Sequence, residues 1–268
     1  MNEKKDQRSI SSDVYDEDYF LSHVAGHEKI KNIEDLEVIL KHRERAFGLA
    51  DIQQGQKVLD IGCGRGEIVL KSLFSGATAV GIDYSRASMS IAKLLIKKHA
   101  PQKMSDSISL VRAGAAELPF RDHSIDRIFC LSVVEHLNDV ELKNCLKESY
   151  RILKTGGRLI ITTSPNTWVY RFGYRLTLIP RMIMKKKLLP WTKDRGVEWR
   201  KYHVNEQNVL SLSRYLKGAG FRCCVWPFPG NPYHGDSGVK RILFPLFCEM
   251  RPLSYIFCNT LFAVGIKE

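Results

Sequence analysis

Short apolar runs alternate with amphipathic stretches along most of the chain from residue 57 onward. The runs have the length and composition of buried strands, and the stretches between them repeat apolar residues at helical spacing. Alternation of this kind predicts an α/β fold, with a parallel sheet and helices on both of its faces. The predicted strands are 57–61, 78–83, 108–113, 125–132, 158–164, 222–228 and 260–267.

Helices are predicted between these strands and before the first of them. Ser85 suits the N-cap of one helix, and Gly156 and Gly157 are predicted to end another. The alternation fails over residues 166–204, which indicates an insertion after the fifth strand. The predicted helices are 34–52, 66–77, 85–100, 139–154 and 205–221.

A glycine-rich loop, Asp60-x-Gly62-x-Gly64-x-Gly66, follows the first predicted strand. Such a loop lies at the carboxyl edge of a parallel sheet, where ligands bind against a helix N-terminus. The spacing differs from G-x-G-x-x-G, and no Lys-Ser or Lys-Thr follows as a phosphate-binding loop requires. Glu67 at the helix N-terminus would also repel a pyrophosphate. The loop therefore favours a ligand without a phosphate chain.

Asp83 ends the second predicted strand, 23 residues after Asp60. A carboxylate at this place can accept hydrogen bonds from both hydroxyls of a ribose. Together, the loop and Asp83 predict an adenosine-bearing ligand whose other end is not a phosphate chain.

Five sequence blocks occur in the order and spacing of the class I S-adenosylmethionine-dependent methyltransferases, which the chain resembles over roughly residues 42–166. The resemblance is closest to the small-molecule branch, which includes the ubiquinone and menaquinone methyltransferases. It implies a Rossmann-like, seven-stranded, mostly parallel sheet, S-adenosylmethionine as cofactor and S-adenosylhomocysteine as product. The blocks are VLDIGCGRGE, GIDYS, AGAAELPF, IDRIFCLSVVEHLND and ESYRILKTGGRLIITTSPN.

The resemblance also implies which residues bind the cofactor. Asp83 would bind the ribose, and Tyr84 would lie beside the adenine. Gly114 and Ala115 stand where the family carries an acid, so only a backbone N–H contact to the adenine is expected there. The methionine end and the sulfonium would be lined by Asp60, Gly62, Cys63, Gly64, Gly66, Ser132 and Val133.

Glu135 and His136 lie where the methyl acceptor would approach. Methyl transfer is an in-line displacement, so alignment of donor and acceptor supplies much of the rate. A hydroxyl acceptor also loses a proton, which a histidine can take. His136 and His203 are therefore candidate bases. Alternatively, Glu135 and His136 only fix the loop, His203 is a surface residue, and the acceptor ionises unaided.

The N-terminal residues 1–50 precede the predicted α/β domain, which spans residues 51–268. Tyr15, Tyr19, Phe20 and His27 are candidates for a lid over the cofactor, as in related enzymes, or for simple packing on the domain.

The insertion at 167–204 is strongly basic. Residues 168–203 hold ten Lys and Arg against two acids, interleaved with aromatic residues, in a chain of net charge +12. This composition suits an anionic membrane surface or an amphiphilic acceptor. It also suits RNA, which is less favoured, or a cover that closes the active site.

The seven cysteines include no CxxC pair and no metal-ligand spacing, so no metal is expected. No uncharged apolar run reaches the roughly 18 residues that a spanning helix needs. We therefore expect a cytoplasmic protein, peripheral at a membrane if the insertion binds lipid. The predicted function is methyl transfer to oxygen or carbon of a small or lipid-like acceptor. An RNA methyltransferase and a non-catalytic membrane-surface or regulatory module that retains the fold are the alternatives.

Overall fold

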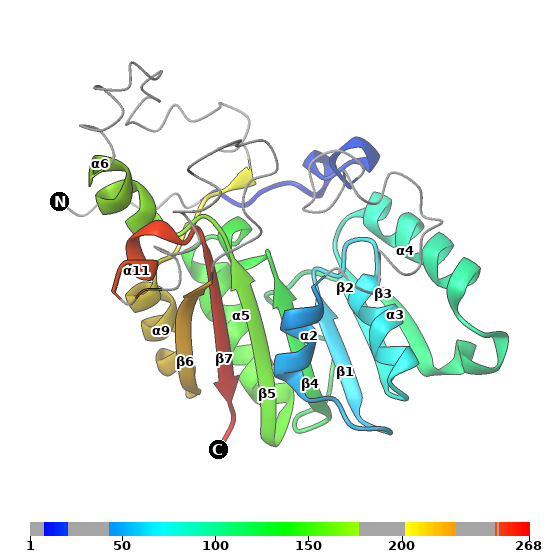
Figure 1. The fold of residues 1–268 in the computed structure, drawn as a ribbon. Helices are drawn as coiled ribbons and strands as arrows, with labels where there is room; N and C mark the ends of the chain where they lie inside the picture. The colour runs from blue at the N-terminus through cyan, green and yellow to red at the C-terminus, as the bar shows by residue number, and fades with distance from the viewer. Residues whose placement is uncertain (1–7, 21–42, 177–201, 229–249, 251) are drawn as a thin grey trace.

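One seven-stranded sheet organises the part of the chain that the structure describes, shown in Figure 1. The computed structural model describes residues 8–20, 43–176, 202–228, 250 and 252–268. The strand order is β3-β2-β1-β4-β5-β7-β6, and β7 runs antiparallel to both of its neighbours. This confirms the predicted seven-stranded, mostly parallel sheet. The strands are β1 (Lys57–Ile61), β2 (Thr78–Asp83), β3 (Ile108–Arg112), β4 (Ile125–Leu131), β5 (Leu153–Thr163), β6 (Arg222–Phe228) and β7 (Thr260–Ile266).

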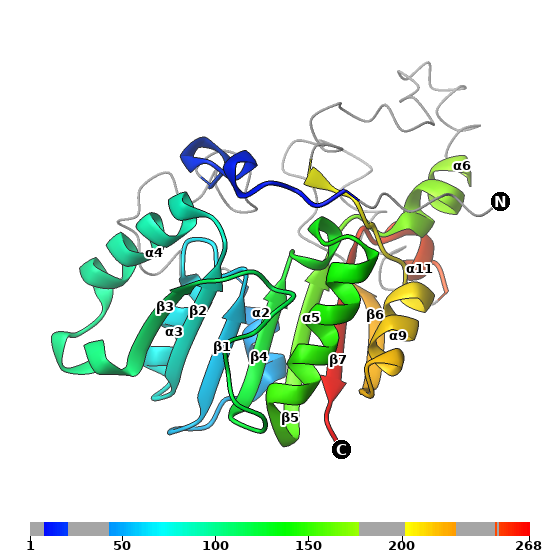
Figure 2. The same ribbon diagram turned by 180° about the vertical axis from the view of Figure 1, so that it is seen from behind.

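Helices cover both faces of this sheet, as Figures 1 and 2 show. One face carries α2 (Glu44–Ala50) and α3 (Glu67–Phe74), and α4 (Arg86–His99) packs beside α3. The opposite face carries α5 (Asp139–Ile152) and α9 (Val209–Gly218). The shorter helices are η1 (Ser12–Val14), η3 (Gln102–Ser107), η4 (Val134–His136), η5 (Val169–Gly173), α6 (Tyr174–Leu176) and α11 (Ser254–Phe257).

The central strands are apolar on both faces because both faces are covered. Leu59 of β1 packs into the cluster that includes Leu142 and Leu146 of α5. Its neighbour Val58 belongs to the cluster on the other face, with Ala46 of α2. Burying both faces fixes the register of the sheet, and hence the places where β1, β2 and β4 end.

Gly156 and Gly157 lie inside β5, so the prediction that they end a helix was wrong. Helix α5 ends at Ile152, and Leu153 is already extended and paired with Ile125 of β4. The pairing resumes between Arg127 and Arg158, so the glycines occupy an irregularity in the strand. Gly156 has a φ of 77°, a left-handed conformation that favours glycine.

The predicted helix over 34–52 was wrong as a continuous element. Residues 34–42 lie outside the described residues, and the helix that follows begins at Glu44. Arg43 has a φ of 63°, which a right-handed helix cannot contain. Its guanidinium Nη1 donates a hydrogen bond to the carbonyl oxygen of Leu131 at 3.1 Å. This contact directs Arg43 to the carboxyl end of β4.

Candidate functional site

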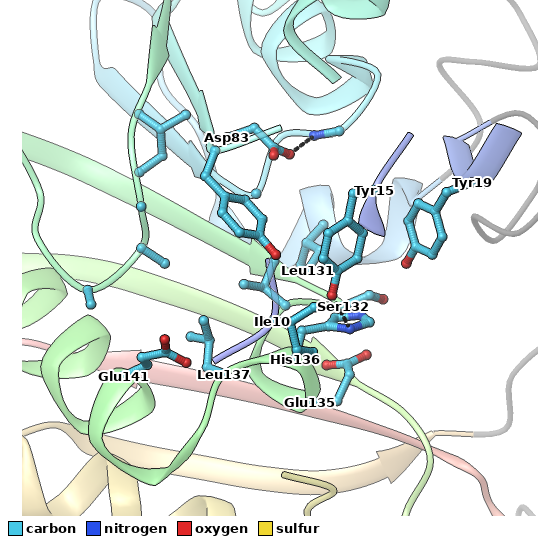
Figure 3. Close-up of a pocket in the computed structure, with 18 of the residues that line it drawn as sticks. Ile10, Tyr15, Tyr19, Asp83, Leu131, Ser132, Glu135, His136, Leu137 and Glu141 are labelled. Atoms are coloured by element: carbon cyan, nitrogen blue, oxygen red, sulfur yellow. Dashed lines mark hydrogen bonds between the residues drawn. The ribbon is translucent and has the colours of Figure 1, made fainter. Parts of the chain in front are cut away.

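A cavity of about 330 Å³ lies at the carboxyl edge of the sheet. Its wall comes mainly from the loops after β1, β2, β3 and β4 and from the N-terminal segment between Ile10 and Phe20. Figure 3 shows side chains from these separate segments pointing toward one another. The edge that the sequence assigned to ligand binding therefore contains a cavity.

The loop after β1 brings its backbone close to Asp83. Gly64 N donates to Asp83 Oδ2 at 3.1 Å, and Ser85 N donates to Oδ1 at 2.9 Å. Burial raises the pKa of Asp83, and these two hydrogen bonds oppose the rise. Gly62 has no room for a side chain, because a Cβ would lie 2.4 Å from Val133 Cγ2. The loops after β1 and β4 are thus in direct contact.

Eight of the predicted cofactor-binding residues line the cavity: Gly62, Gly64, Asp83, Tyr84, Gly114, Ala115, Ser132 and Val133. The three predicted catalytic residues, Glu135, His136 and His203, line it too. Residues far apart in the sequence are thereby gathered around one space.

Asp60, Cys63 and Gly66 are not among the lining residues. Asp60 is buried, which raises its pKa to about 8. Cys63 packs in a small cluster with Val69 of α3. A Cβ on Gly66 would lie 3.2 Å from that of Ala92, so Gly66 lets α3 and α4 approach closely.

Arg43 and Glu141 also line the cavity, although the sequence did not single them out. The charge of Arg43 opposes the burial-driven rise in the pKa of Asp60, so the two side chains interact. No sequence signal distinguishes Arg43 from its basic neighbours. Glu141 is the third residue of α5 and caps Asn138 N, and the pattern Asn-x-x-Glu before a helix could have identified it.

His136 is held through its Nδ1 atom. This nitrogen lies 2.8 Å from the carbonyl oxygen of Tyr202 and 3.0 Å from the hydroxyl of Tyr15. A carbonyl oxygen only accepts hydrogen bonds, so Nδ1 carries the hydrogen and Nε2 has the lone pair. Burial and the nearby His203 lower the pKa of His136 to about 3. His136 is therefore neutral near pH 7.

Both the carboxylate and the backbone oxygen of Glu135 accept hydrogen bonds from residues near the cavity. Its carboxylate accepts from Thr163 Oγ1 at 2.8 Å, and its backbone oxygen accepts from Val204 N and Asn205 N. Glu135 is 1% exposed, and burial raises the pKa of its carboxyl group. These contacts favour the interpretation that Glu135 fixes the turn. Three atoms that could bind a metal ion lie within 4.8 Å of one another, one each from Glu135, His136 and His203.

The N-terminal segment contributes aromatic rings to the wall of the cavity. Tyr15 and Phe20 are 6% and 5% exposed, and both line the cavity with Tyr19. Arg65, in the glycine loop, donates to the carbonyl oxygen of Phe20 at 3.4 Å. Residues Tyr15–Phe20 therefore contact the cavity loops directly, whereas His27 lies outside the described residues.

A family model described as a methyltransferase domain matches residues 59–161. The chain is 33% identical to methyltransferase GfsG of Streptomyces halstedii over 119 residues, which cover 44% of this chain and 41% of that protein. It is 29% identical to a ubiquinone biosynthesis O-methyltransferase of Pseudomonas putida over 157 residues, which cover 54% of this chain and 65% of that protein. The alignments thus span less than two thirds of these curated relatives.

Solved structures show the same fold. A methyltransferase in complex with the activator Trm112 of Haloferax volcanii has a TM-score of 0.61 at 17% identity, covering 96% of this chain and 99% of that chain. Phosphoethanolamine N-methyltransferase 2 of Haemonchus contortus, in complex with S-adenosyl-L-methionine, has a TM-score of 0.58 at 16% identity, covering 96% and 60%. Identities this low support the fold alone.

Proposed function

The chain belongs to the class I S-adenosylmethionine-dependent methyltransferases through its domain at residues 59–161, and from this we propose that it transfers a methyl group to oxygen or carbon of a small or lipid-like acceptor. One observation carries the proposal: a single cavity holds the glycine loop, Asp83 and the turn from Ser132 to His136.

The residues of the cavity fit S-adenosylmethionine. Asp83 is a nearly buried carboxylate at the end of β2, suited to the ribose hydroxyls. Tyr84, Gly114 and Ala115 supply the adenine side of the proposed site. Methionine carries one ammonium and one carboxylate group, and Arg43 at the cavity wall can pair with the carboxylate.

The acceptor would approach the methyl group from the side of His136 and His203. When bound, S-adenosylmethionine would supply an electrophilic methyl group for the acceptor atom, with S-adenosylhomocysteine as the product. A hydroxyl acceptor would donate its hydrogen to His136 Nε2. Because His136 is a weak base at its lowered pKa, we assign it alignment of the acceptor. His203, whose ring centroid lies 4.9 Å from that of His136, is the second candidate base for the released proton.

Calorimetric titration with S-adenosylhomocysteine tests the cofactor. We expect the wild type to bind at sub-millimolar concentration and Asp83→Asn to bind on the order of tenfold or more weakly. Asp122→Asn is the control, because Asp122 is an exposed carboxylate that pairs with Arg151. A folded wild type that does not bind would contradict the proposed function.

Transfer of labelled methyl from S-adenosylmethionine to a panel of phenols, alcohols, amines and lipid extracts then identifies the acceptor. The RNA alternative rests on cations such as Lys185, Lys186 and Lys187, which lie outside the described residues. It predicts RNA binding that weakens steeply with salt and is lost when these three lysines are neutralised. The non-catalytic alternative predicts that Asp83→Asn retains full function in cells.

A further inference from the structure

We propose that Tyr15 is a positioning residue for His136, and that the loop carrying Asp83 holds Tyr15 in place through Ser85. The proposal rests on the proposed function, because it concerns the acceptor side of the same cavity. It makes the N-terminal segment a working part of the site as well as a cover.

Ser85 connects Asp83 to the N-terminal segment. Its backbone N donates to Asp83 Oδ1 at 2.9 Å, and its hydroxyl donates to the carbonyl oxygen of Tyr15 at 2.7 Å. The same hydroxyl accepts from Ser88 N at 3.2 Å, which caps α4. Ser85 is fully buried, so its hydroxyl has little freedom to choose other partners. Ser85 therefore holds the backbone of Tyr15 next to Asp83, the proposed ribose-binding residue at the end of β2.

The side chain of Tyr15 points toward His136, as Figure 3 shows. Its centroid lies 4.8 Å from that of Tyr19, 5.6 Å from that of Tyr84 and 5.8 Å from that of Tyr202. These neighbours come from three separate segments and leave the ring little space to rotate. The hydroxyl consequently stays 3.0 Å from His136 Nδ1.

This hydroxyl gives Nδ1 a second hydrogen-bond acceptor. Nδ1–H already donates to the carbonyl oxygen of Tyr202, and it can share its hydrogen with the oxygen of Tyr15. Two acceptors on one nitrogen favour the tautomer with hydrogen on Nδ1 and fix the plane of the ring. Nε2 makes no hydrogen bond to the described residues, so its lone pair is left for the hydrogen of an acceptor hydroxyl. Such control of tautomer and orientation is how a neighbouring group prepares a histidine for catalysis.

The test is Tyr15→Phe, which keeps the ring and removes the hydroxyl. Tyr19→Phe is the matched control, because Tyr19 belongs to the same segment and cavity wall. The tautomer of His136 is measured by ¹⁵N–¹H correlation of the imidazole nitrogens in the protein without ligand. We expect hydrogen on Nδ1 in the wild type and in Tyr19→Phe, and a measurable fraction on Nε2 in Tyr15→Phe.

A second pair of variants tests the anchor. Ser85→Ala should change the tautomer as Tyr15→Phe does, whereas Ser90→Ala should not, because the hydroxyl of Ser90 bonds only within α4 at an exposed position. With the acceptor from the methyl-transfer panel, Tyr15→Phe should lower kcat by on the order of tenfold with the KM for S-adenosylmethionine nearly unchanged.

An unchanged tautomer in Tyr15→Phe, or the same change in Tyr19→Phe, would overturn the proposal and leave Tyr15 a packing residue. Titration of the same samples with S-adenosylhomocysteine separates the two proposals. If the wild type does not bind S-adenosylhomocysteine, the proposed function is contradicted. The tautomer of His136 is measured without ligand, so that result tests the role of Tyr15 independently.

Discussion

At the scale of single residues, His136 shows how burial sets the chemistry of a side chain. An exposed histidine gains a proton near pH 6.5, but burial and His203 lower the pKa of His136 to about 3. Below pH 6.5 the unfolded chain therefore takes up a proton that folded His136 excludes. The stability from His136 is complete above pH 6.5 and decreases as the pH falls toward 3.

Between pH 7 and pH 5.5, this proton uptake should lower the free energy of unfolding by about 1 kcal/mol. Denaturant unfolding of the wild type and His136→Asn at both pH values measures it, and the variant should lack this part of the pH dependence. His123→Asn, at an exposed loop position, should behave as the wild type does. Equal pH dependence in His136→Asn and wild type would show that His136 is protonated in the folded state.

The contribution of Asp60 to stability should change with pH in the opposite direction to that of His136. Its folded pKa is raised to about 8, so the folded state keeps a proton that the unfolded state loses near pH 3.8. Its contribution to stability is present below pH 3.8 and is lost as the pH rises through 8. Without cofactor, Asp60→Asn should therefore be more stable than the wild type, by a margin that grows from pH 5 to pH 8. Thermal unfolding at the two pH values measures this margin, and a constant margin would contradict the raised pKa.

At the scale of elements, α5 and α9 offer a matched pair of caps. Asn138 and Asn208 each form a capping box, but only Asn138 also donates to Ser9 of the N-terminal segment, at 3.2 Å. Replacing either asparagine by alanine should lower the free energy of unfolding by about 1 kcal/mol. Only Asn138→Ala should also weaken the binding of S-adenosylhomocysteine, measured by calorimetry. Equal affinities in the two variants would mean that Ser9 plays no part in closing the cavity.

The strands could be predicted from sequence because apolar periodicity and β-branched composition report burial directly. The end of α5 could not be predicted in this way, because Gly156 lies at an irregularity in β5. That irregularity depends on how β5 pairs with β4. The start of α2 was missed for a similar reason, since the left-handed Arg43 is held by the distant Leu131. Within the glycine loop, the sequence could not separate Gly62, at the cavity, from Gly66, which packs against Ala92.

At the scale of the whole molecule, α6 lies toward the same edge of the sheet as the carboxyl ends of β1, β2 and β4, as Figure 1 shows, and the cavity is at that edge. Arg171, Phe172, Arg175 and Leu176 are exposed on η5 and α6. This segment packs so closely on α11 that a Cβ on Gly173 would lie 1.9 Å from the backbone oxygen of Ile256. No helix in the described ranges is long and apolar enough to cross a membrane.

A surface with two arginines and two large apolar side chains suits contact with an anionic bilayer. Each cation near such a surface contributes about 1 kcal/mol to the free energy of binding. A protein that methylates a lipid-like acceptor would gain from such contact, because the acceptor resides in the bilayer. We therefore expect the full chain to float with anionic vesicles but not with neutral ones, and to dissociate as salt rises. Phe172→Glu with Leu176→Glu should reduce flotation several-fold. Phe74→Glu on α3, also an exposed phenylalanine, should not. An equal loss in both variants would mean that added charge, and not this surface, governs binding, and absence of flotation in the wild type would favour a water-soluble acceptor.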